Sequence, residues 1–370
     1  MSRGRFYVIF LALVGFGILL TSCASSKERP TYRTDADTRA ETASSGPVNF
    51  QIIYVVHGDA NYTYHDSTGK WHAADSEAVV QALYVARNSP QTEVFIFHQK
   101  VRRTKLFGRT TDGVFYHYRG GIRIHEEAYS RLQDSNFRIE SDLYHEYSLP
   151  SLSQPLTSFF VYSGHEFPAS DGAVYSQSYP KRNFSLPEFA RAIDRFQGPA
   201  SDREKPFALI VLSTCYGGSP ATIKTLSTFC HFLVASPAYL HLSYLDTRAF
   251  KDLSESGAVP LDTGKIHAVA TEVARQSFNR LQENTQTEIT VAVYDVQKTT
   301  FPQLLSNSKN WITQSTGYHD CMEDSGFDPV VAALGVEVYY RPPRFGALKN
   351  KPQHSGWECS GNSAASKSIP

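Results

Sequence analysis

Two side chains that could carry out nucleophilic catalysis follow two apolar runs of the chain. Residues 158–162 lead into Ser-Gly-His165, and residues 207–212 lead into Ser-Thr-Cys215. A thiol attacks as its thiolate, and a nearby imidazole can take its proton. If the two runs are neighbouring strands, about 4.8 Å apart, their ends deliver both side chains to one cleft. We interpret the pair as a nucleophile and its base; taken singly, each residue could also be an ordinary core residue.

Six apolar, β-branched runs are expected to be the strands that position this pair. They cover residues 51–56, 93–98, 158–162, 207–212, 231–235 and 288–294. The runs are continuous rather than alternating, which is typical of strands covered on both faces. Helix-like stretches lie between most of them, at residues 76–87, 185–196, 220–229 and 265–281. This order predicts an α/β fold with a doubly wound, mostly parallel six-stranded sheet and helices on both faces.

One segment interrupts this alternation. Residues 113–125 follow the strand period of two and turn at Gly120-Gly121, which is typical of a β-hairpin. We expect an inserted hairpin that forms a small accessory sheet or overhangs the site.

The order of these motifs resembles the caspase fold, and within it the clostripain-like cysteine peptidases of clan CD. A strand with Ser-Gly-His165, a capped helix that begins at Ser185-Leu-Pro-Glu188, and a strand followed by Cys215-Tyr-Gly carry the resemblance. It implies that His165 is the catalytic histidine and Cys215 the nucleophile. It also implies an oxyanion hole made by the backbone N–H of Cys215 and one from the turn Gly164 to Glu166. The implied reaction is peptide-bond hydrolysis through a thioester, without a cofactor or metal.

The chain departs from that family at three places near the pair, one of which is the tract Tyr-Gly-Gly directly after Cys215. Glu166 stands where a glycine usually follows the histidine, and Ser213 stands where an aspartate that recognises a basic side chain usually precedes the cysteine. The identity of the preferred substrate residue therefore stays open. A non-catalytic binding protein that keeps the fold is the alternative function.

Three further residues lie at expected strand ends and are candidates for contact with substrate, together with Ser213. His57 and Asp59 follow the first strand, and Asp246 lies beyond the fifth. For each of them, ordinary turn chemistry is the alternative.

A second enzyme class can be assembled from the same sequence. Ser213-Thr-Cys215-Tyr-Gly loosely imitates the nucleophile elbow of α/β-hydrolases. In that fold the acid and the histidine follow the nucleophile, so Asp246 or Asp295 would act with His267 or His319. His267 falls inside an expected helix, which is a poor position for a catalytic loop histidine.

The N-terminus resembles a bacterial lipoprotein signal. Arg3 and Arg5 precede an apolar run to Leu20, and Leu20-Thr-Ser-Cys23 ends it. The run is short for a membrane-spanning helix, which needs roughly 20 residues. The resemblance implies removal of residues 1–22 and lipidation of Cys23, with residues 23–48 as a flexible tether. We expect a lipid-anchored protein of the cell envelope, on the outer membrane if the cell is Gram-negative.

The remaining composition limits partners and cofactors. Lys and Arg number 36 and so do Asp and Glu, which argues against a nucleic-acid partner. No His-Glu-x-x-His or other zinc spacing occurs, so we expect no metal, and we expect a monomer that acts on peptides or proteins.

The other cysteines belong to a folded domain over residues 49–340 and an irregular tail over residues 341–370. Cys230 lies in an apolar context and is expected in the core. Cys321 and Cys359 could form a disulfide in an oxidising compartment.

Overall fold

The computed structural model describes most of the chain from residue 47 onward. The described residues are 47–101, 111–131, 136–148, 156–168, 174–176, 179–197, 205–256, 260–296, 318–320, 322 and 335–360. The predicted signal sequence, the predicted lipidation site at Cys23 and the predicted tether up to residue 46 lie outside them, as does Cys321, so the structure bears on neither lipidation nor a Cys321–Cys359 disulfide. No helix among the described residues is long and apolar enough to cross a membrane.

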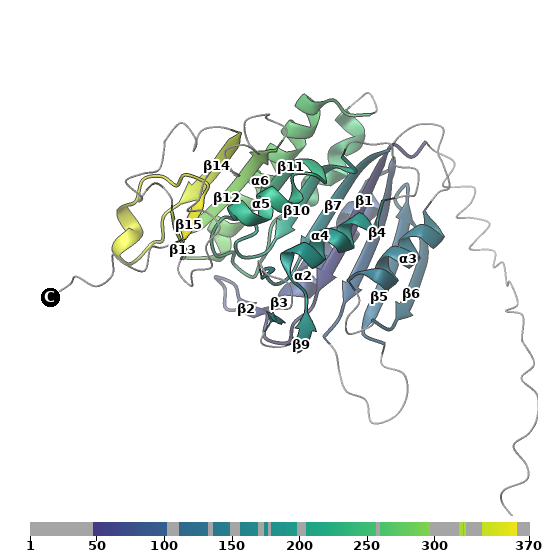
Figure 1. Cartoon of the computed structure of the whole chain (residues 1–370), viewed down its shortest axis with the longest axis horizontal. Helices are drawn as coiled ribbons and strands as arrows, with labels where there is room; N and C mark the ends of the chain where they lie inside the picture. Colours follow the sequence, from purple (N-terminus) through teal and green to yellow (C-terminus); the bar gives the residue numbers. More distant parts are fainter. Residues whose placement is uncertain are drawn as a thin grey trace, which may run out of the picture. The chain divides into compact units, whose positions relative to one another are not determined.

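The six predicted strands are confirmed, each to within one residue at its ends. They are β1 (Phe50–His57), β4 (Thr92–Gln99), β7 (Thr157–Ser163), β10 (Phe207–Ser213), β11 (Cys230–Ala235) and β12 (Ile289–Asp295). Their order across the sheet is β12-β11-β10-β7-β1-β4 (Figure 1). The first five in the chain are parallel and β12 is antiparallel. The chain thus has the predicted α/β class with a mostly parallel core sheet.

The predicted number of strands is wrong, because the sheet has nine. The inserted hairpin, β5 (Gly113–Arg119) and β6 (Ile122–Tyr129), is not a separate accessory sheet; it extends the central sheet beyond β4. Without the hairpin, β4 would be an edge strand with unpaired backbone groups. Strand β5 pairs with β4 along its whole length, opposite residues Glu93 to Gln99 of β4. At the other edge β14 (Val336–Arg341) pairs with β12.

Helices cover both faces of the sheet, as predicted. One face carries α2 (Ala74–Asn88), α6 (Thr263–Asn284) and the 3-10 helix η1 (Arg248–Ser256). The other carries α3 (Arg138–Tyr147), α4 (Leu186–Asp194) and α5 (Pro220–Leu226). Alternate residues of β1 enter the two cores, Ile52 one and Ile53 the other, which explains why the strand has no polar period.

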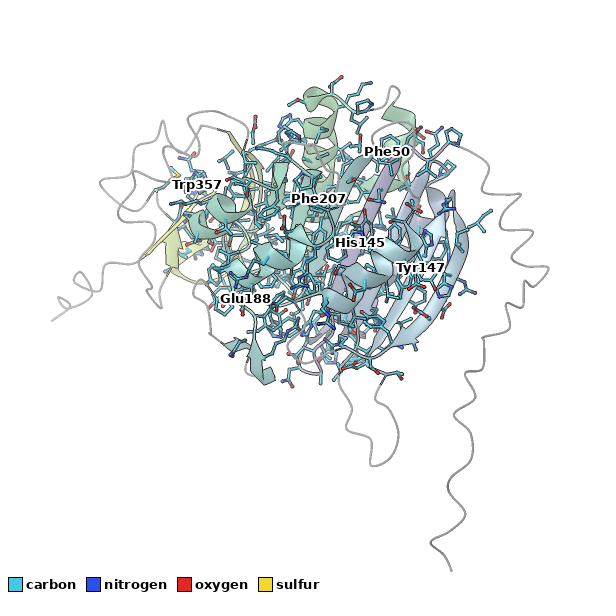
Figure 2. All side chains as sticks on the ribbon, turned by 45° about the vertical axis from the view of Figure 1, so that its right-hand side comes forward. Phe50, His145, Tyr147, Glu188, Phe207 and Trp357 are labelled. Atoms are coloured by element: carbon cyan, nitrogen blue, oxygen red, sulfur yellow. The ribbon has the colours of Figure 1, made fainter. Side chains whose placement is uncertain are left out.

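Helix α4 begins with the predicted capping box. The Ser185 hydroxyl accepts a hydrogen bond from the backbone N–H of Glu188, and the Glu188 carboxylate accepts one from the backbone N–H of Ser185. These bonds satisfy two backbone donors that a helix start leaves free. Figure 2 labels Glu188 at this helix start.

Residues 354–358 of the tail are buried, whereas residues 344–350 are exposed. The tail contains η3 (Ala347–Asn350) and β15 (Glu358–Ser360), which pairs with β13 (Tyr318–Asp320). Trp357, labelled in Figure 2, is 1% exposed and packs on Tyr294 of β12. The tail therefore contributes to the core on the α4 and α5 side of the sheet.

Two small hairpins complete the described structure. They are β2 (Thr63–His65) with β3 (Trp71–Ala73), and β8 (Val174–Ser176) with β9 (Tyr179–Asn183). The first follows the loop that leaves β1. It therefore begins on the side of the sheet where the carboxyl ends of the parallel strands lie.

Candidate active site at the carboxyl ends of the parallel strands

Cys215 and His165 leave the sheet level with each other. Ser213 of β10 is the register partner of Ser163 of β7, and each functional residue follows its serine by two positions. The backbone N–H of Gly164 donates to the carbonyl of Ser213 at 3.2 Å, which joins the two loops just beyond the strands. The predicted juxtaposition of the two loops is therefore confirmed.

The loop that carries Cys215 is tightly specified. Tyr216 has a φ of 51°, an uncommon conformation for a residue other than glycine, and its N–H donates to Ala238 at 2.9 Å. A Cβ on Gly217 would lie 2.9 Å from the Thr214 hydroxyl, and one on Gly218 would overlap the Tyr294 hydroxyl. Gly217 allows the loop to fold back on Thr214 and Leu212, and Gly218 allows it to pack against Tyr294 of β12.

The thiol of Cys215 is half-buried and bonded to backbone. Sγ lies 3.7 Å from the carbonyl oxygen of Leu240, to which it donates, and accepts from the Leu240 N–H at 3.4 Å. Burial raises the pKa of the thiol, and the nearby negative charge of Glu166 raises it further. Within the described residues, no hydrogen bond joins Sγ to the His165 ring. In this conformation the thiol is protonated at neutral pH.

His165 is held by a buried carboxylate. Its Nε2 lies 2.6 Å from Oδ2 of Asp59, and Oδ1 of Asp59 accepts from the backbone N–H of Asn61 at 2.9 Å. Burial lowers the pKa of His165, and the Asp59 charge partly offsets that effect. A neutral ring with its proton on Nε2 satisfies the carboxylate, which leaves the Nδ1 lone pair as the basic position.

The Nδ1 position is occupied by a residue that the sequence did not single out. The Tyr62 hydroxyl lies 2.5 Å from Nδ1 of His165, and the two rings are 4.1 Å apart between centroids. The Tyr175 hydroxyl accepts from the backbone N–H of His165 at 3.0 Å. The only sequence signal for Tyr62 was its closeness to Asp59 in a turn.

The hydrogen bonds of the backbone N–H groups near the thiol limit which of these groups could form an oxyanion hole. Gly164 cannot serve as expected, because its N–H already bonds to Ser213. It is a glycine for steric reasons, since a Cβ there would lie 2.6 Å from the Tyr162 hydroxyl and 2.9 Å from His57. Within the described residues, the N–H groups of Cys215 and Glu166 have no backbone acceptor.

The four residues expected to contact substrate are bonded within the protein. Asp59 binds His165 instead. The Ser213 hydroxyl is buried and accepts from the Leu245 N–H at 2.7 Å. The Asp246 carboxylate is buried and accepts from Arg248, at the wall of a separate polar pocket. None of these three side chains is available to a peptide in this conformation.

His57 lies behind His165 rather than in the cleft. It is fully buried, and its ring is edge-on to that of His165 with centroids 5.9 Å apart. Arg182 donates to its Nδ1 at 3.1 Å, and burial together with this cation holds the pKa of His57 well below its usual value. His57 is thus a neutral packing partner of His165, and the expectation of substrate contact is not supported.

The residues of the hydrolase alternative lie elsewhere. His267 on α6 pairs with Glu337 at 3.5 Å and packs on Phe232. It lines a pocket together with Asp295, which is the register partner of Phe232 near the beginning of β11. The thiol lies beyond the opposite ends of the parallel strands. Asp246 is bonded to Arg248, and the side chain of His319 lies outside the described residues.

The predicted core cysteine is confirmed. Cys230 is fully buried at the start of β11, and its thiol donates to the Leu226 carbonyl at 3.6 Å. Burial raises the pKa of Cys230 to about 12, so it is not a nucleophile at neutral pH. Among the described residues, no cluster of three or more His, Cys, Asp or Glu side chains could hold a metal ion.

Comparisons with known proteins found similar solved structures. No protein-family model and no curated protein matches the chain. A secreted C11 cysteine protease from Bacteroides thetaiotaomicron, "iotapain", is similar at 11% identity and a TM-score of 0.44, covering 68% of this chain and 67% of that one. Its complex with an irreversible peptide inhibitor gives 10% identity, the same TM-score and the same coverage.

An inactive zymogen C11 protease from Parabacteroides distasonis is also similar. It has 10% identity and a TM-score of 0.43, and the match covers 70% of this chain and 64% of that chain. At such identity the likeness concerns the fold and carries no residue role to this chain.

Proposed function

We propose that this protein is a cysteine peptidase in which Cys215 is the nucleophile, His165 the base and Asp59 the group that orients the base. One observation carries the proposal: the thiol and an imidazole bonded to a buried carboxylate follow register-matched residues of adjacent strands. A histidine paired with a buried carboxylate on one nitrogen is a base on the other, as in catalytic triads.

The chemistry follows from these groups. Nδ1 of His165 takes the thiol proton, and the thiolate attacks the peptide carbonyl to form a C–S bond. The N–H groups of Cys215 and Glu166 stabilise the oxyanion. The imidazolium returns the proton to the amine as the C–N bond breaks, which leaves a thioester. Water then attacks with His165 as base, releasing the acid and restoring the thiol.

The test is hydrolysis of a positional-scanning peptide library by the detergent-solubilised full chain. Cys215→Ala and His165→Ala should abolish turnover of any substrate found. Cys230→Ala is the matched control, because it removes a thiol that is buried away from the cleft. Turnover that survives in Cys215→Ala would refute the proposal.

One observation favours the second candidate, a non-catalytic binding protein. The thiol is bonded to Leu240 and has a raised pKa, so the resting arrangement is not that of a formed dyad. A chain that binds library peptides without cleaving them, equally well with Cys215→Ala, would establish this function instead.

The proposed location is the cell envelope, with anchoring through lipid on Cys23. The motif Leu20-Thr-Ser-Cys23 after an apolar run supports it. Labelled palmitate should enter the full chain in bacterial cells and be lost in Cys23→Ala. Cys230→Ala should label normally.

A further inference from the structure

We propose that the Tyr62 hydroxyl is a cap on the catalytic base, so that His165 can accept the proton of Cys215 only after Tyr62 releases Nδ1. This inference rests on the proposed function and assigns to it a residue that controls the reactivity of the thiol. Tyr62 is a positioning residue, because it acts on the thiol through His165.

The cap is a direct contact. The Tyr62 oxygen lies 2.5 Å from Nδ1 of His165. The opposite ring nitrogen is bonded to the Asp59 carboxylate. A carboxylate can only accept, so Nε2 carries the ring proton and Nδ1 is left to accept from the Tyr62 O–H. Both nitrogens of the base are then occupied.

The thiol makes a different set of contacts. Its proton is directed to the Leu240 carbonyl, and the hydrogen bonds that join it to other described residues are both with the backbone of Leu240. A proton relay from thiol through phenol to imidazole would need a hydrogen bond between Cys215 and Tyr62, and the structure has none. The tyrosine therefore blocks the base rather than extending it.

Tyr62 is held in this position by its own backbone. Its N–H donates to the Asp59 carbonyl at 3.0 Å, and its carbonyl accepts from the N–H of Ala74 at 2.9 Å. Since Asp59 also binds His165, one residue fixes both the base and the turn that presents the cap. The tyrosine ring is only partly buried, so side-chain rotation alone can release Nδ1.

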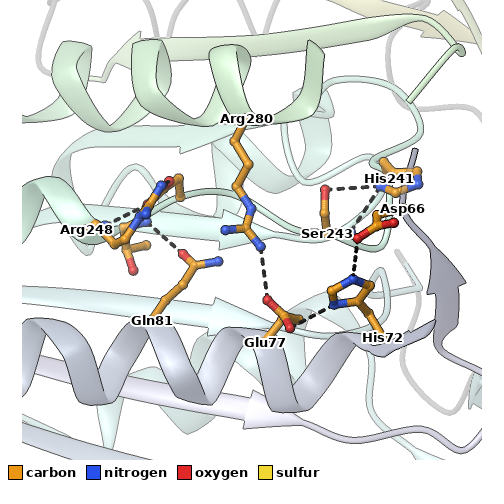
Figure 3. A network of polar contacts seen from close by, with 10 residues as sticks. Asp66, His72, Glu77, Gln81, His241, Ser243, Arg248 and Arg280 are labelled. Carbon is orange, nitrogen blue, oxygen red and sulfur yellow. Dashed lines mark hydrogen bonds and ion pairs between the residues drawn. The ribbon is translucent and has the colours of Figure 1, made fainter. Parts of the chain in front are cut away.

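The hairpin that follows Tyr62 is bonded to helix α2, which in turn is bonded to helix α6, as Figure 3 shows. His72 of β3 bonds to Asp66 at 2.8 Å and to Glu77 of α2 at 2.9 Å. Arg280 of α6 in turn donates to Glu77 at 3.4 Å. This network keeps the β2–β3 hairpin, and the turn before it, in place in the resting protein.

The test compares the rate at which iodoacetamide labels Cys215 in the full-length wild-type chain and in Tyr62→Phe. The variant keeps the ring and removes only the hydroxyl. Loss of one hydrogen bond to Nδ1 should raise the labelling rate about twofold to tenfold. It should also move the pH profile of labelling to lower pH, because a free imidazole favours the thiolate. A merely structural role would not produce this shift.

The matched control is Tyr64→Phe in the hairpin that follows Tyr62. The Tyr64 ring stacks on His72 instead of His165, so its labelling rate and pH profile should equal those of the wild type. Adding His165→Ala to Tyr62→Phe should return the rate to that of His165→Ala alone.

The possible results distinguish a failure of the proposed cap from a failure of the proposed function. A labelling rate in Tyr62→Phe equal to or below the wild type overturns the cap, even if peptide hydrolysis depends on Cys215 and His165. The absence of hydrolysis in both chains, with labelling indifferent to His165→Ala, overturns the peptidase itself.

Discussion

The contact between Asp59 and His165 makes a quantitative prediction for Asp59→Asn. In the wild type the carboxylate accepts the Nε2 proton at 2.6 Å and is almost fully buried. An asparagine amide can turn its NH2 toward Nε2, which moves the ring proton to Nδ1 and removes the basic lone pair from the side facing Tyr62 and the cleft. The imidazolium formed during attack also loses its counter-charge.

The size of the effect follows from the bond that is lost. A hydrogen bond to a charged group contributes about 1.5–3 kcal/mol, and about 1.4 kcal/mol corresponds to tenfold in rate. We therefore expect kcat/KM to fall about tenfold to 150-fold. The acid limb of the pH profile should move to lower pH, because the Asp59 charge raises the pKa of His165 against the effect of burial.

The assay is kcat/KM across pH with the best library peptide, with folding checked by circular dichroism. Asp252→Asn is the control, since it removes an aspartate charge from a partly exposed ion pair with Lys251 in η1 and leaves His165 and the hairpin network untouched. An Asp59→Asn protein that is folded and has wild-type kcat/KM would refute the assignment of Asp59 as the orienting group.

Three further predictions concern the frame of the site. Gly218→Ala should reduce stability by about 1–3 kcal/mol and impair turnover, because its Cβ would overlap the Tyr294 hydroxyl; Gly264→Ala at the start of α6, where the atom nearest to a Cβ would be Oδ1 of Asp262 at 3.3 Å, is the milder control, and equal urea midpoints for both would contradict this. Trp357→Ala should lower the free energy of unfolding by about 3–5 kcal/mol, whereas Trp71→Ala, 58% exposed, should change it little. Burial holds the pKa of His57 below its usual 6.5, so the unfolded chain binds a proton that the folded chain does not. The free energy of unfolding should therefore fall as pH drops below about 6.5, and His57→Gln should flatten that slope; a slope unchanged by His57→Gln would disprove the attribution.

The central strands and the position of the reactive pair could be predicted because their signals are local. Continuous apolar runs such as residues 207–212 mark strands buried on both faces. Parallel pairing then brings their carboxyl ends to one edge of the sheet. Four helices were found for the same reason, and α4 through the capping box at Ser185 and Glu188.

Helix α3 and strand β14 were missed because their buried faces are not apolar runs. The buried residues of α3 are Glu140, Ser141 and Tyr144, and Oε1 of Glu140 accepts hydrogen bonds from Gln99 and Tyr129 of two strands. All six residues of β14 are partly exposed. Both segments do carry a short periodic signal, because Ile139, Leu143 and Tyr147 pack on the core four residues apart and Val336 and Val338 two residues apart. Because the segments are short and mainly polar, these signals were overlooked.

The partners of the site residues could not be read from the sequence, because they come from segments distant in the chain. Asp59 and Tyr62 lie more than one hundred residues before His165, and Leu240 follows Cys215 by 25. The position of Asp59 just after strand β1 identified it as a candidate site residue. The expected partner was the substrate, whereas the carboxylate is bonded to His165. Only the packing of the turn after β1 against the loop after β7 shows this bond.

The most direct test of the central claim is to trap the acyl-enzyme. The full chain is mixed with an activated ester of a preferred library peptide, quenched in acid and analysed by intact mass and peptide mapping. The mechanism predicts the acyl mass on Cys215, formed more slowly in His165→Ala. Either of two results would contradict it. One is an acyl group on another residue, and the other is turnover that proceeds without an adduct and persists in Cys215→Ala.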